Sequence, residues 1–324
     1  MSYFRVLGLE REPFSTSPDP AFFYQSAQYR ETLANLIIEF RLKRGLNVVL
    51  GDIGVGKTTL GRKLVQMLRA RDGFVFHMVL DPTYPSEELF YNELTRTMNI
   101  DLPMANPTLV DYRDGLERFL FRKGLEEKQT IVLIIDEAHK LNALSLEALR
   151  VLLNYETNDS KLLQLVLLGQ IELLPTITAM PNFADRISLK ATLRPLTLQE
   201  THEMIEFRLR EAGYSSRVPL FAPEAIVQIH AYTEGYPRRI AMLCHQSLRQ
   251  LVMRNGRTAD QPLVAELIQQ EINSGWSHHQ RLKSAHREKI LSFTPQPRPL
   301  ADQEAAAARD AASRDPWGFT EHAA

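Results

Sequence analysis

One glycine-rich loop constrains the fold of this chain more than any other feature of its sequence. It follows an apolar segment at residues 47–50 and opens a segment with helical spacing, and its residues are Gly51, Asp52, Ile53, Gly54, Val55, Gly56, Lys57, Thr58 and Thr59. The loop fits the pattern G-x-x-x-x-G-K-[ST], in which backbone N–H groups and a helix N-terminus converge on phosphate oxygens. The sequence therefore predicts a strand, a phosphate-binding loop and a helix in that order.

A second apolar segment, at residues 131–135, ends at the acidic pair Asp136 and Glu137. At the carboxyl edge of a parallel sheet, such a pair lies beside the phosphate-binding loop. We therefore expect Lys57 to reach the β- and γ-phosphates of ATP, and Thr58 and Asp136 to hold Mg²⁺. Binding alone needs no second carboxylate, so Glu137 indicates hydrolysis, as the catalytic base that deprotonates the attacking water.

Strand-like and helix-like segments alternate only in the first two thirds of the 324 residues. Runs rich in Val, Ile and Leu predict strands at residues 48–51, 75–80, 131–136 and 165–169. Amphipathic segments predict helices between them, at 58–71, 86–98, 110–127 and 145–155, and only helices after Pro195, at 198–212, 223–234, 237–254 and 261–273. The pattern predicts an α/β P-loop NTPase fold, a doubly wound parallel sheet with a small C-terminal α-helical lid domain.

Composition changes along the chain suggest how it is divided. We expect an aromatic and Pro-rich segment at residues 1–30, an α/β core at 31–195, a helical lid at 196–275 and a tail at 276–324. The tail is rich in Pro and Ala and has no sustained apolar face, which favours disorder.

Charge and cysteine content restrict the binding partners and the cellular compartment of the chain rather than its fold. With 38 Lys and Arg against 39 Asp and Glu, the formal net charge is -1, so DNA binding is not indicated by net charge. The lone cysteine, Cys244, favours a reducing compartment. No apolar run approaches the roughly 18 residues that a membrane span needs. The sequence therefore predicts a cytoplasmic protein without direct membrane insertion.

The sequence Asp136, Glu137, Ala138 and His139 also matches a box found in a helicase superfamily. That function needs a second α/β domain around the nucleotide. Past Glu137 the sequence shows one more clear strand, at residues 165–169, and then helices. A single core followed by a lid is the order of parts in AAA+ ATPases instead.

Three further residues stand where AAA+ ATPases place groups that contact the γ-phosphate. Gln170 ends a strand, as sensor 1 does, and Arg238 begins a lid helix, as sensor 2 does. Arg186 follows a Pro-bounded helix, as does an arginine finger that reaches the neighbouring subunit of a homo-oligomer. Simpler roles stay open: Gln170 as a polar strand cap, Arg186 as the ion-pair partner of Asp185, and Arg239 in place of Arg238.

The chain resembles the ExeA/GspA group of AAA+ ATPases over most of residues 1–275. The matching stretches are residues 7–9, 13–14, 18–24, 51–59, 134–138, 149–157, 161–170, 186–187, 200–201 and 235–240. The resemblance implies an ATPase that uses ATP and Mg²⁺ to drive or assemble a secretion- or pilus-type envelope system. It would act through protein partners, from the cytoplasmic side of the inner membrane.

Two departures from the group stand out. Tyr29 occupies a position where the group often has His, and the transmembrane helix and peptidoglycan-binding domain that secretion members carry after the lid find no match in this sequence. The resemblance therefore implies a soluble ATPase module that depends on its partners for any contact with the cell wall.

Two other functions stay open. A DNA-associated AAA+ regulator of transposase or initiator type would share the fold. Basic stretches at residues 208–210, 238–239 and 249–257 suit DNA, although a solvated helix face explains them as well. The other function is a nucleotide-gated scaffold with little turnover.

Aromatic side chains gather in the segment before the core. They are Phe14, Phe22, Phe23 and Tyr24. Flat aromatic and apolar groups suit a nucleotide base, so the segment is expected to wrap adenine, and the alternative is that these rings plug the edge of the sheet.

Overall fold

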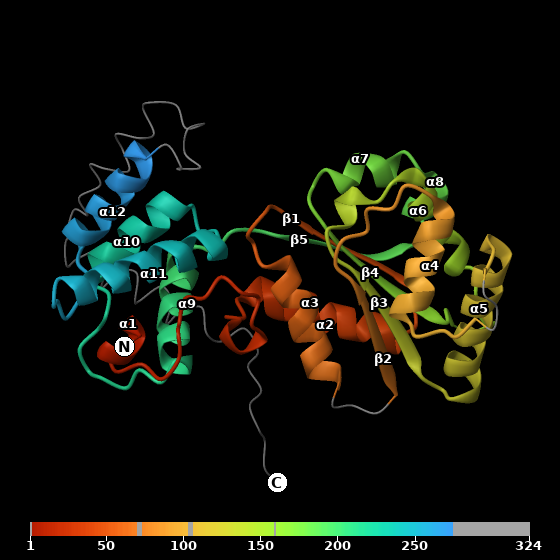
Figure 1. The fold of residues 1–324 in the computed structure, drawn as a ribbon, viewed down its shortest axis with the longest axis horizontal. Coiled ribbons are helices and arrows are strands. Elements are labelled where there is room, and N and C mark those ends of the chain that lie inside the picture. Colours follow the sequence, from red (N-terminus) through yellow and green to blue (C-terminus); the bar gives the residue numbers. More distant parts are fainter. Residues whose placement is uncertain (1, 70–72, 103–105, 159, 275–324) are drawn as a thin grey trace, which may run out of the picture.

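The computed structural model describes residues 2–69, 73–102, 106–158 and 160–274. They form two lobes, one containing a sheet and the other made of helices, joined by extended segments (Figure 1). The predicted tail at 276–324 lies outside the described residues, and the division of the chain at residues 30, 195 and 275 stays a prediction.

A five-stranded parallel sheet organises the first lobe. Its strand order is β2-β3-β4-β1-β5, and the strands are β1 (Leu46–Gly51), β2 (Phe74–Val79), β3 (Thr130–Ile135), β4 (Leu163–Gly169) and β5 (Ile187–Leu193). The three central strands are buried almost throughout, as expected for a parallel sheet covered on both faces. Their carboxyl ends share one edge, where the loop at 51–59 and the acidic pair follow β1 and β3.

Strand β5 is the one element of the sheet that the sequence pattern did not predict. It pairs in parallel with β1 at the edge of the sheet, and its side chains alternate between half-buried and exposed positions. An edge strand covered on one face needs only a period-2 pattern, here Ile187, Leu189, Ala191 and Leu193, rather than a continuous apolar run. The helix-only interpretation of the chain after 169 was therefore wrong for residues 187–193.

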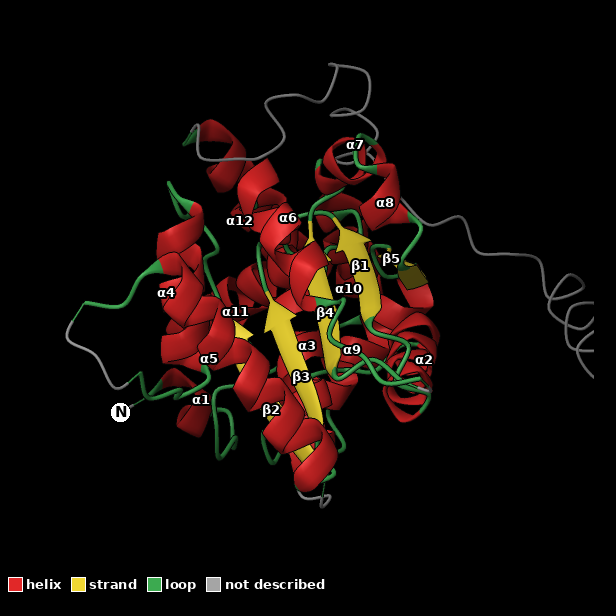
Figure 2. Cartoon of the chain, turned by 90° about the vertical axis from the view of Figure 1, so that its right-hand side faces the viewer, coloured by secondary structure: helices red, strands yellow, loops and turns green. Residues whose placement is uncertain are grey.

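Helices cover both faces of the sheet (Figure 2). One face packs on α2 (Ala27–Arg41) and α3 (Lys57–Arg69), through alternate strand residues such as Val49 and Ile134. The other packs on α4 (Glu87–Thr97), α5 (Leu109–Phe121) and α6 (Ala143–Leu152), through the intervening residues such as Leu50 and Leu133. Shorter pieces complete the lobe: η1 (Pro20–Phe22), η2 (Arg122–Glu126), η3 (Ala138–Lys140), α7 (Leu173–Thr178) and α8 (Pro181–Ala184).

The second lobe, called the lid here, consists of α9 (Leu198–Glu211), α10 (Pro223–Thr233), α11 (Pro237–Met253) and α12 (Gln261–Asn273). Local sequence explains where these helices start: Thr197 and Glu200 form a capping box on α9, and α10 and α11 each begin with Pro. The short α1 (Tyr3–Val6) packs on α11, so the N-terminal segment runs from the lid to the sheet lobe (Figure 1).

A tight backbone contact joins the lid to the linker that leaves the sheet. Leu196 N donates to Gly235 O at 2.8 Å, and Gly235 has φ +76°. A Cβ atom at Gly235 would lie 2.0 Å from Leu196 O, so only glycine fits. One hydrophobic cluster also runs through the lid, the N-terminal segment and the α2–α3 face of the sheet. The lid is thus anchored directly above the carboxyl edge of the sheet.

Candidate nucleotide-binding site

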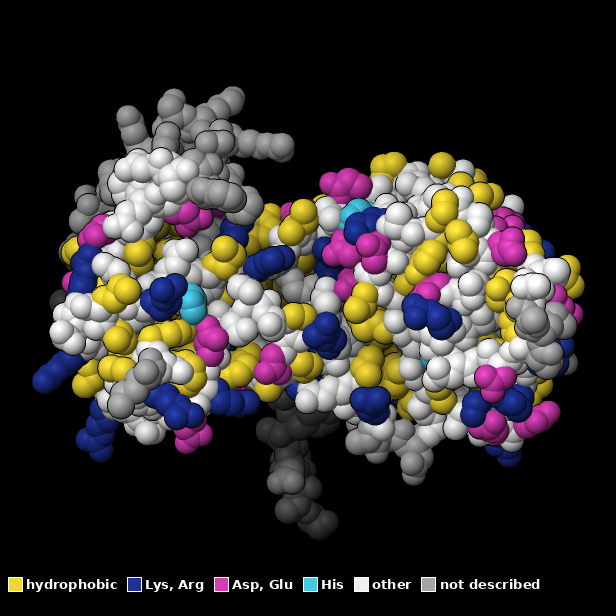
Figure 3. Space-filling model, viewed as in Figure 1, with side chains coloured by type: hydrophobic (Ala, Val, Ile, Leu, Met, Phe, Trp, Pro, Cys, Tyr) yellow, Lys and Arg dark blue, Asp and Glu magenta, His cyan; other side chains and the backbone are white. Residues whose placement is uncertain are grey.

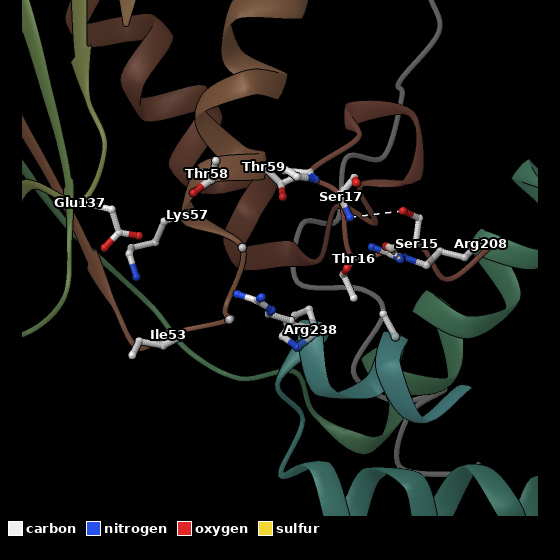
Figure 4. Close-up of a pocket in the computed structure, with 15 residues that line it drawn as sticks. Ser15, Thr16, Ser17, Ile53, Lys57, Thr58, Thr59, Glu137, Arg208 and Arg238 are labelled. Carbon is white, nitrogen blue, oxygen red and sulfur yellow. Dashed lines mark hydrogen bonds between the residues drawn. The ribbon is translucent and has the colours of Figure 1, made fainter. Parts of the chain in front are cut away.

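A cleft of about 310 Å³ lies between the glycine-rich loop, the N-terminal segment and the lid (Figure 4). This is at the lower end of the sizes usual for ligand sites. Its lining includes Lys57, Thr58 and Glu137 from the sheet lobe and Arg208 and Arg238 from the lid. The sequence predicted the first three and Arg238 as neighbours, and the fold brings them to one cavity.

The glycine-rich loop wraps around the ammonium group of Lys57, the first residue of α3. Nζ donates to Gly51 O at 2.8 Å and to Asp52 O at 3.0 Å, and only 6% of the residue is exposed. Burial lowers the pKa of Lys57, although the nearby carboxylates of Glu137 and Asp136 act in the opposite direction. Positive φ angles at Gly54 and Gly56 let the loop turn this tightly.

Tyr29 supports the loop from behind. Its side chain is buried in α2, stacks at a tilt on Phe23, and its hydroxyl donates to Val55 O. A tyrosine at this position therefore fixes the loop backbone, a role that the sequence comparison with the ExeA/GspA group did not reveal.

Thr58 and Asp136 meet where the two predicted motifs adjoin. Thr58 Oγ1 donates to Asp136 Oδ2 at 2.6 Å, and Asp136 Oδ1 accepts from Glu137 N at 2.9 Å. Burial raises the pKa of Asp136, which is 3% exposed. A hydroxyl and one carboxylate suit Mg²⁺, which takes oxygen ligands and keeps several of its waters. Among the described residues no cluster of three or more His, Cys, Asp or Glu offers a denser metal site.

A contiguous polar group lies at the carboxyl edge of the sheet and consists of Glu137, His139 and Gln170. Glu137 lines the cleft, and its Oε2 lies 3.5 Å from His139 Nε2. His139 Nε2 in turn lies 3.0 Å from Gln170 Nε2, at the end of β4. Within the described chain, the buried His139 Nδ1 has no partner. Sequence reasoning identified Glu137 and Gln170 but passed over His139, whose only signal was the helicase-like box that it completes.

The lid presents Arg238, and not Arg239, to the cleft. Arg238 N donates to Gly54 O at 3.2 Å, and its side chain lines the cavity. Arg239 instead pairs with Glu234 at 3.1 Å and lies over the ring of Tyr236 at 4.6 Å from its centroid. The assignment of Arg238 as sensor 2 stays a prediction, and the geometry favours it over Arg239.

Arg186 lies away from the cleft, at the start of β5. Ile187 pairs with Leu46 at the beginning of β1, whereas the loop follows Gly51, which pairs with Leu193. The length of the strand places Arg186 about 20 Å from its own loop. Its Nε donates to Asn182 O at 3.2 Å, and in the described structure it forms no ion pair with Asp185.

Aromatic side chains of the N-terminal segment do not line the cleft. Phe14, Phe22 and Phe23 are buried at 1%, 7% and 6% exposure in the cluster that joins lid and sheet lobe. Residues 15–18, which connect these anchors, line the cleft instead, together with Ala241 and Arg208 of the lid. The lining of the cleft thus favours the alternative of a hydrophobic plug for these three rings, and that the segment wraps adenine stays a prediction, carried by residues 15–18.

Comparison with known proteins places this geometry in a family. An AAA domain model matches residues 41–177. General secretion pathway protein A of Aeromonas hydrophila is 32% identical over 248 residues, which are 76% of this chain and 44% of that protein. The chain contains an AAA domain and is similar to general secretion pathway protein A, which supports its place among the ExeA/GspA-like AAA proteins.

Two further relatives are more distant. An uncharacterised HTH-type transcriptional regulator of Methanocaldococcus jannaschii is 24% identical over 254 residues, 68% of this chain and 61% of that protein. The solved structure of the Aeropyrum pernix ORC2 protein in ADPNP and ADP complexes superimposes with a TM-score of 0.61 at 14% identity, covering 93% of this chain and 89% of that one. This likeness shows the fold: an α/β P-loop NTPase core with a helical lid.

The ExeA/GspA-like chain spans less than half of general secretion pathway protein A and about six tenths of the regulator. The AAA fold implies nucleotide binding. Across the described residues, no helix combines the length and the apolar character that crossing a bilayer requires.

Proposed function

We propose that this ExeA/GspA-like chain binds ATP with Mg²⁺ in the cleft and hydrolyses it to ADP and phosphate. The observation that carries the proposal is the contact of Thr58 Oγ1 with Asp136 Oδ2 at 2.6 Å, next to Lys57 and Glu137 in one cavity. A hydroxyl, a carboxylate, a buried ammonium and a second carboxylate are the groups that phosphoryl transfer to water requires.

Each residue has a distinct part in the proposed reaction. The backbone N–H groups of residues 51–59 and the start of α3 bind the phosphate oxygens, and Lys57 turns from the loop carbonyls to the β- and γ-phosphates. Thr58 and Asp136 would hold Mg²⁺, which would neutralise phosphate charge when bound. Glu137 orients a water and takes its proton as the water attacks the γ-phosphorus, and Gln170 holds the γ-phosphate as sensor 1.

The active site is completed, on this proposal, by a second copy of the chain. Arg186 sits too far from its own loop to act there, and in the described part of the chain its guanidinium donates to the Asn182 carbonyl and interacts electrostatically with Glu147. Presented to a neighbour's cleft, it would stabilise the charge that develops on the transferred phosphoryl group. We therefore propose a homo-oligomer with composite sites.

The biological role that we favour is to drive or assemble a secretion- or pilus-type envelope system from the cytoplasmic side, through protein partners. Its support is the similarity to general secretion pathway protein A. The chain spans 44% of that protein, so any partner binding by the rest of the relative carries no weight here.

A DNA-associated regulator is the second candidate, because of the similarity to an HTH-type regulator. The structure weakens the argument for DNA binding that rested on basic stretches of the sequence. Of the basic stretches, Arg208 and Arg238 line the cleft, Arg239 pairs with Glu234, and Arg254 pairs with Glu266 at 2.6 Å. On the face shown in Figure 3, Lys and Arg side chains lie scattered among acidic ones and do not gather into a stripe.

Phosphate release measured with and without duplex DNA, at two salt concentrations, separates the functions. The favoured function predicts turnover that DNA leaves unchanged. Stimulation by DNA that disappears at high salt would support the DNA-associated regulator, since phosphate contacts depend steeply on salt. Tight ATP binding with negligible turnover, also at high protein concentration, would indicate the nucleotide-gated scaffold and contradict the proposed hydrolysis.

A further inference from the structure

Arg208 of α9 lies at the end of the cleft opposite Lys57. It projects from the lid toward residues 15–17, while Lys57 and Glu137 stand at the other end (Figure 4). A nucleotide whose phosphates occupy the loop would direct its base toward Arg208, since the two groups line one continuous cavity.

The guanidinium of Arg208 is poorly satisfied by the protein. Nη1 makes two long contacts, 3.5 Å to Pro13 O and 3.4 Å to Ser15 O, and Nε has no partner among the described residues. Among the described residues, no carboxylate forms an ion pair with Arg208. Burial lowers the pKa of Arg208 to about 10, so the group stays charged at neutral pH. Arg208 is half-buried and its Nε is buried, so leaving the group with so few bonds is costly unless a ligand completes its hydrogen bonding.

The chemistry beside Arg208 matches the edge of an adenine base. A guanidinium only donates hydrogen bonds, and the Ser15 carbonyl, 3.4 Å from Nη1, only accepts them. Donor and acceptor thus stand side by side. Adenine presents the complementary pair, a ring nitrogen that accepts next to a 6-amino group that donates, whereas guanine carries an oxygen at position 6.

We infer that Arg208 determines base specificity: its guanidinium donates a hydrogen bond to a ring nitrogen of adenine, while the Ser15 carbonyl accepts from the 6-amino group. This inference rests on the proposed binding of ATP in the cleft. It assigns to a lid arginine the contact that the aromatic residues of the N-terminal segment do not make.

The test compares Arg208→Met with Arg210→Met, which removes an exposed arginine from the same helix. Mg-ATP, Mg-GTP and inorganic tripolyphosphate are titrated into each protein. We expect Arg208→Met to weaken ATP binding roughly 10- to 100-fold, the usual size for a hydrogen bond to a charged group. Tripolyphosphate affinity should stay unchanged, the preference for ATP over GTP should disappear, and Arg210→Met should behave like the parent protein.

Two analogues test the hydrogen bond itself. 7-deaza-ATP lacks the N7 acceptor and 1-deaza-ATP lacks the N1 acceptor, each with the 6-amino group intact. One of them should bind the parent protein as weakly as ATP binds Arg208→Met, and should lose nothing further in the variant. Should Arg208→Met melt early, Arg208→Lys keeps the charge but not the geometry of the donors and is expected to show the same loss of preference.

Three results would overturn the inference. The first is unaltered ATP affinity in a folded Arg208→Met protein. The second is a loss of tripolyphosphate affinity as large as the loss of ATP affinity, and the third is that both analogues bind the parent protein as well as ATP does. Lys57→Ala distinguishes this failure from that of the proposed function. Loss of ATP and tripolyphosphate binding in Lys57→Ala, with no base effect in Arg208→Met, contradicts the role of Arg208 alone, whereas unchanged binding in Lys57→Ala contradicts ATP binding at the loop.

Discussion

The two ends of the cleft are built in different ways. The phosphate end comes from residues 51–59 and 136–137, which directly follow the buried strands β1 and β3. Two of its charged groups, Lys57 and Asp136, already have close partners, at 2.6 Å to 3.0 Å. The base end comes from residues 15–18, Arg208 and Ala241, which lie far apart in sequence, and the Arg208 guanidinium makes only long contacts.

We infer from this difference that the phosphate end is the rigid part of the cleft and the base end the adaptable part. Strand ends in a buried parallel sheet fix the positions of the loop and the acidic pair before any ligand binds, which leaves the turn of Lys57 toward the phosphates as the main reorganisation. The base end depends on how the lid and the N-terminal segment pack together, around the contact between Gly235 and Leu196. We therefore expect changes at the phosphate end to affect turnover most, and changes at the base end to affect nucleotide choice.

The largest fall in kcat should come from replacing Arg186, which lies outside the cleft. This variant tests whether the phosphate end is complete within one chain. Arg186→Ala should lower kcat by roughly 10³-fold, because the transferred phosphoryl group loses an external charge. Lys190→Ala, an exposed cation on the same strand, should leave kcat unchanged. The measurement is phosphate release at saturating ATP.

Subunit mixing tells an effect in trans from a local one. Arg186→Ala subunits keep their loop and Lys57→Ala subunits keep their arginine, so a mixture should recover activity that neither variant has. Specific activity of the parent protein should also rise with concentration. Flat specific activity and no recovery on mixing would mean that the chain works as a monomer.

Glu137→Gln should lower kcat by roughly 10²- to 10³-fold and leave ATP affinity intact. The amide keeps the shape of the side chain but cannot take a proton from water, and Asp136 remains beside Thr58. Turnover at the parental rate would exclude Glu137 as the base and place hydrolysis outside this end of the cleft.

His139→Ala should have a smaller effect, a fall in kcat of roughly 10-fold with KM unchanged, because Glu137 and Gln170 lose the group between them. His139→Gln should restore part of the activity, since an amide can contact both neighbours. Lys140→Ala, which removes only a surface contact with Asp81 at 3.4 Å, serves as the control. An equal loss in Lys140→Ala would point to disruption of η3 rather than positioning of Glu137.

The phosphate end could be predicted from sequence because each motif is local. Lys57 and Thr58 follow one apolar strand and Asp136 another, and the parallel sheet then brings their ends together. Strand β5 could not be recognised by the same signal, since an edge strand shows only alternation. The position of β5 nevertheless decides where Arg186 lies. The proposed role of Arg186 in a neighbouring subunit therefore depends on the strand that the sequence pattern did not predict.

Side chains at the base end escaped prediction for a different physical reason. Residue type alone suggests that the aromatic ring of Phe14 contacts a base and that Arg208 lies on a solvated helix face. Tertiary packing reverses both assignments: Phe14 packs edge-on against Phe221 at 5.9 Å, and Arg208 lines the cleft. Contacts between residues about 200 positions apart leave no local pattern.

The central claim, that the loop around Lys57 binds the triphosphate of ATP, is tested most directly by equilibrium titration of Mg-ATP into Lys57→Ala. Lys63→Ala, further along α3, is the matched control. The account predicts that Lys57→Ala loses at least roughly 100-fold in affinity, about 2.7 kcal/mol, while Lys63→Ala binds like the parent protein. Equal affinity in the two variants, with both folded, would contradict it.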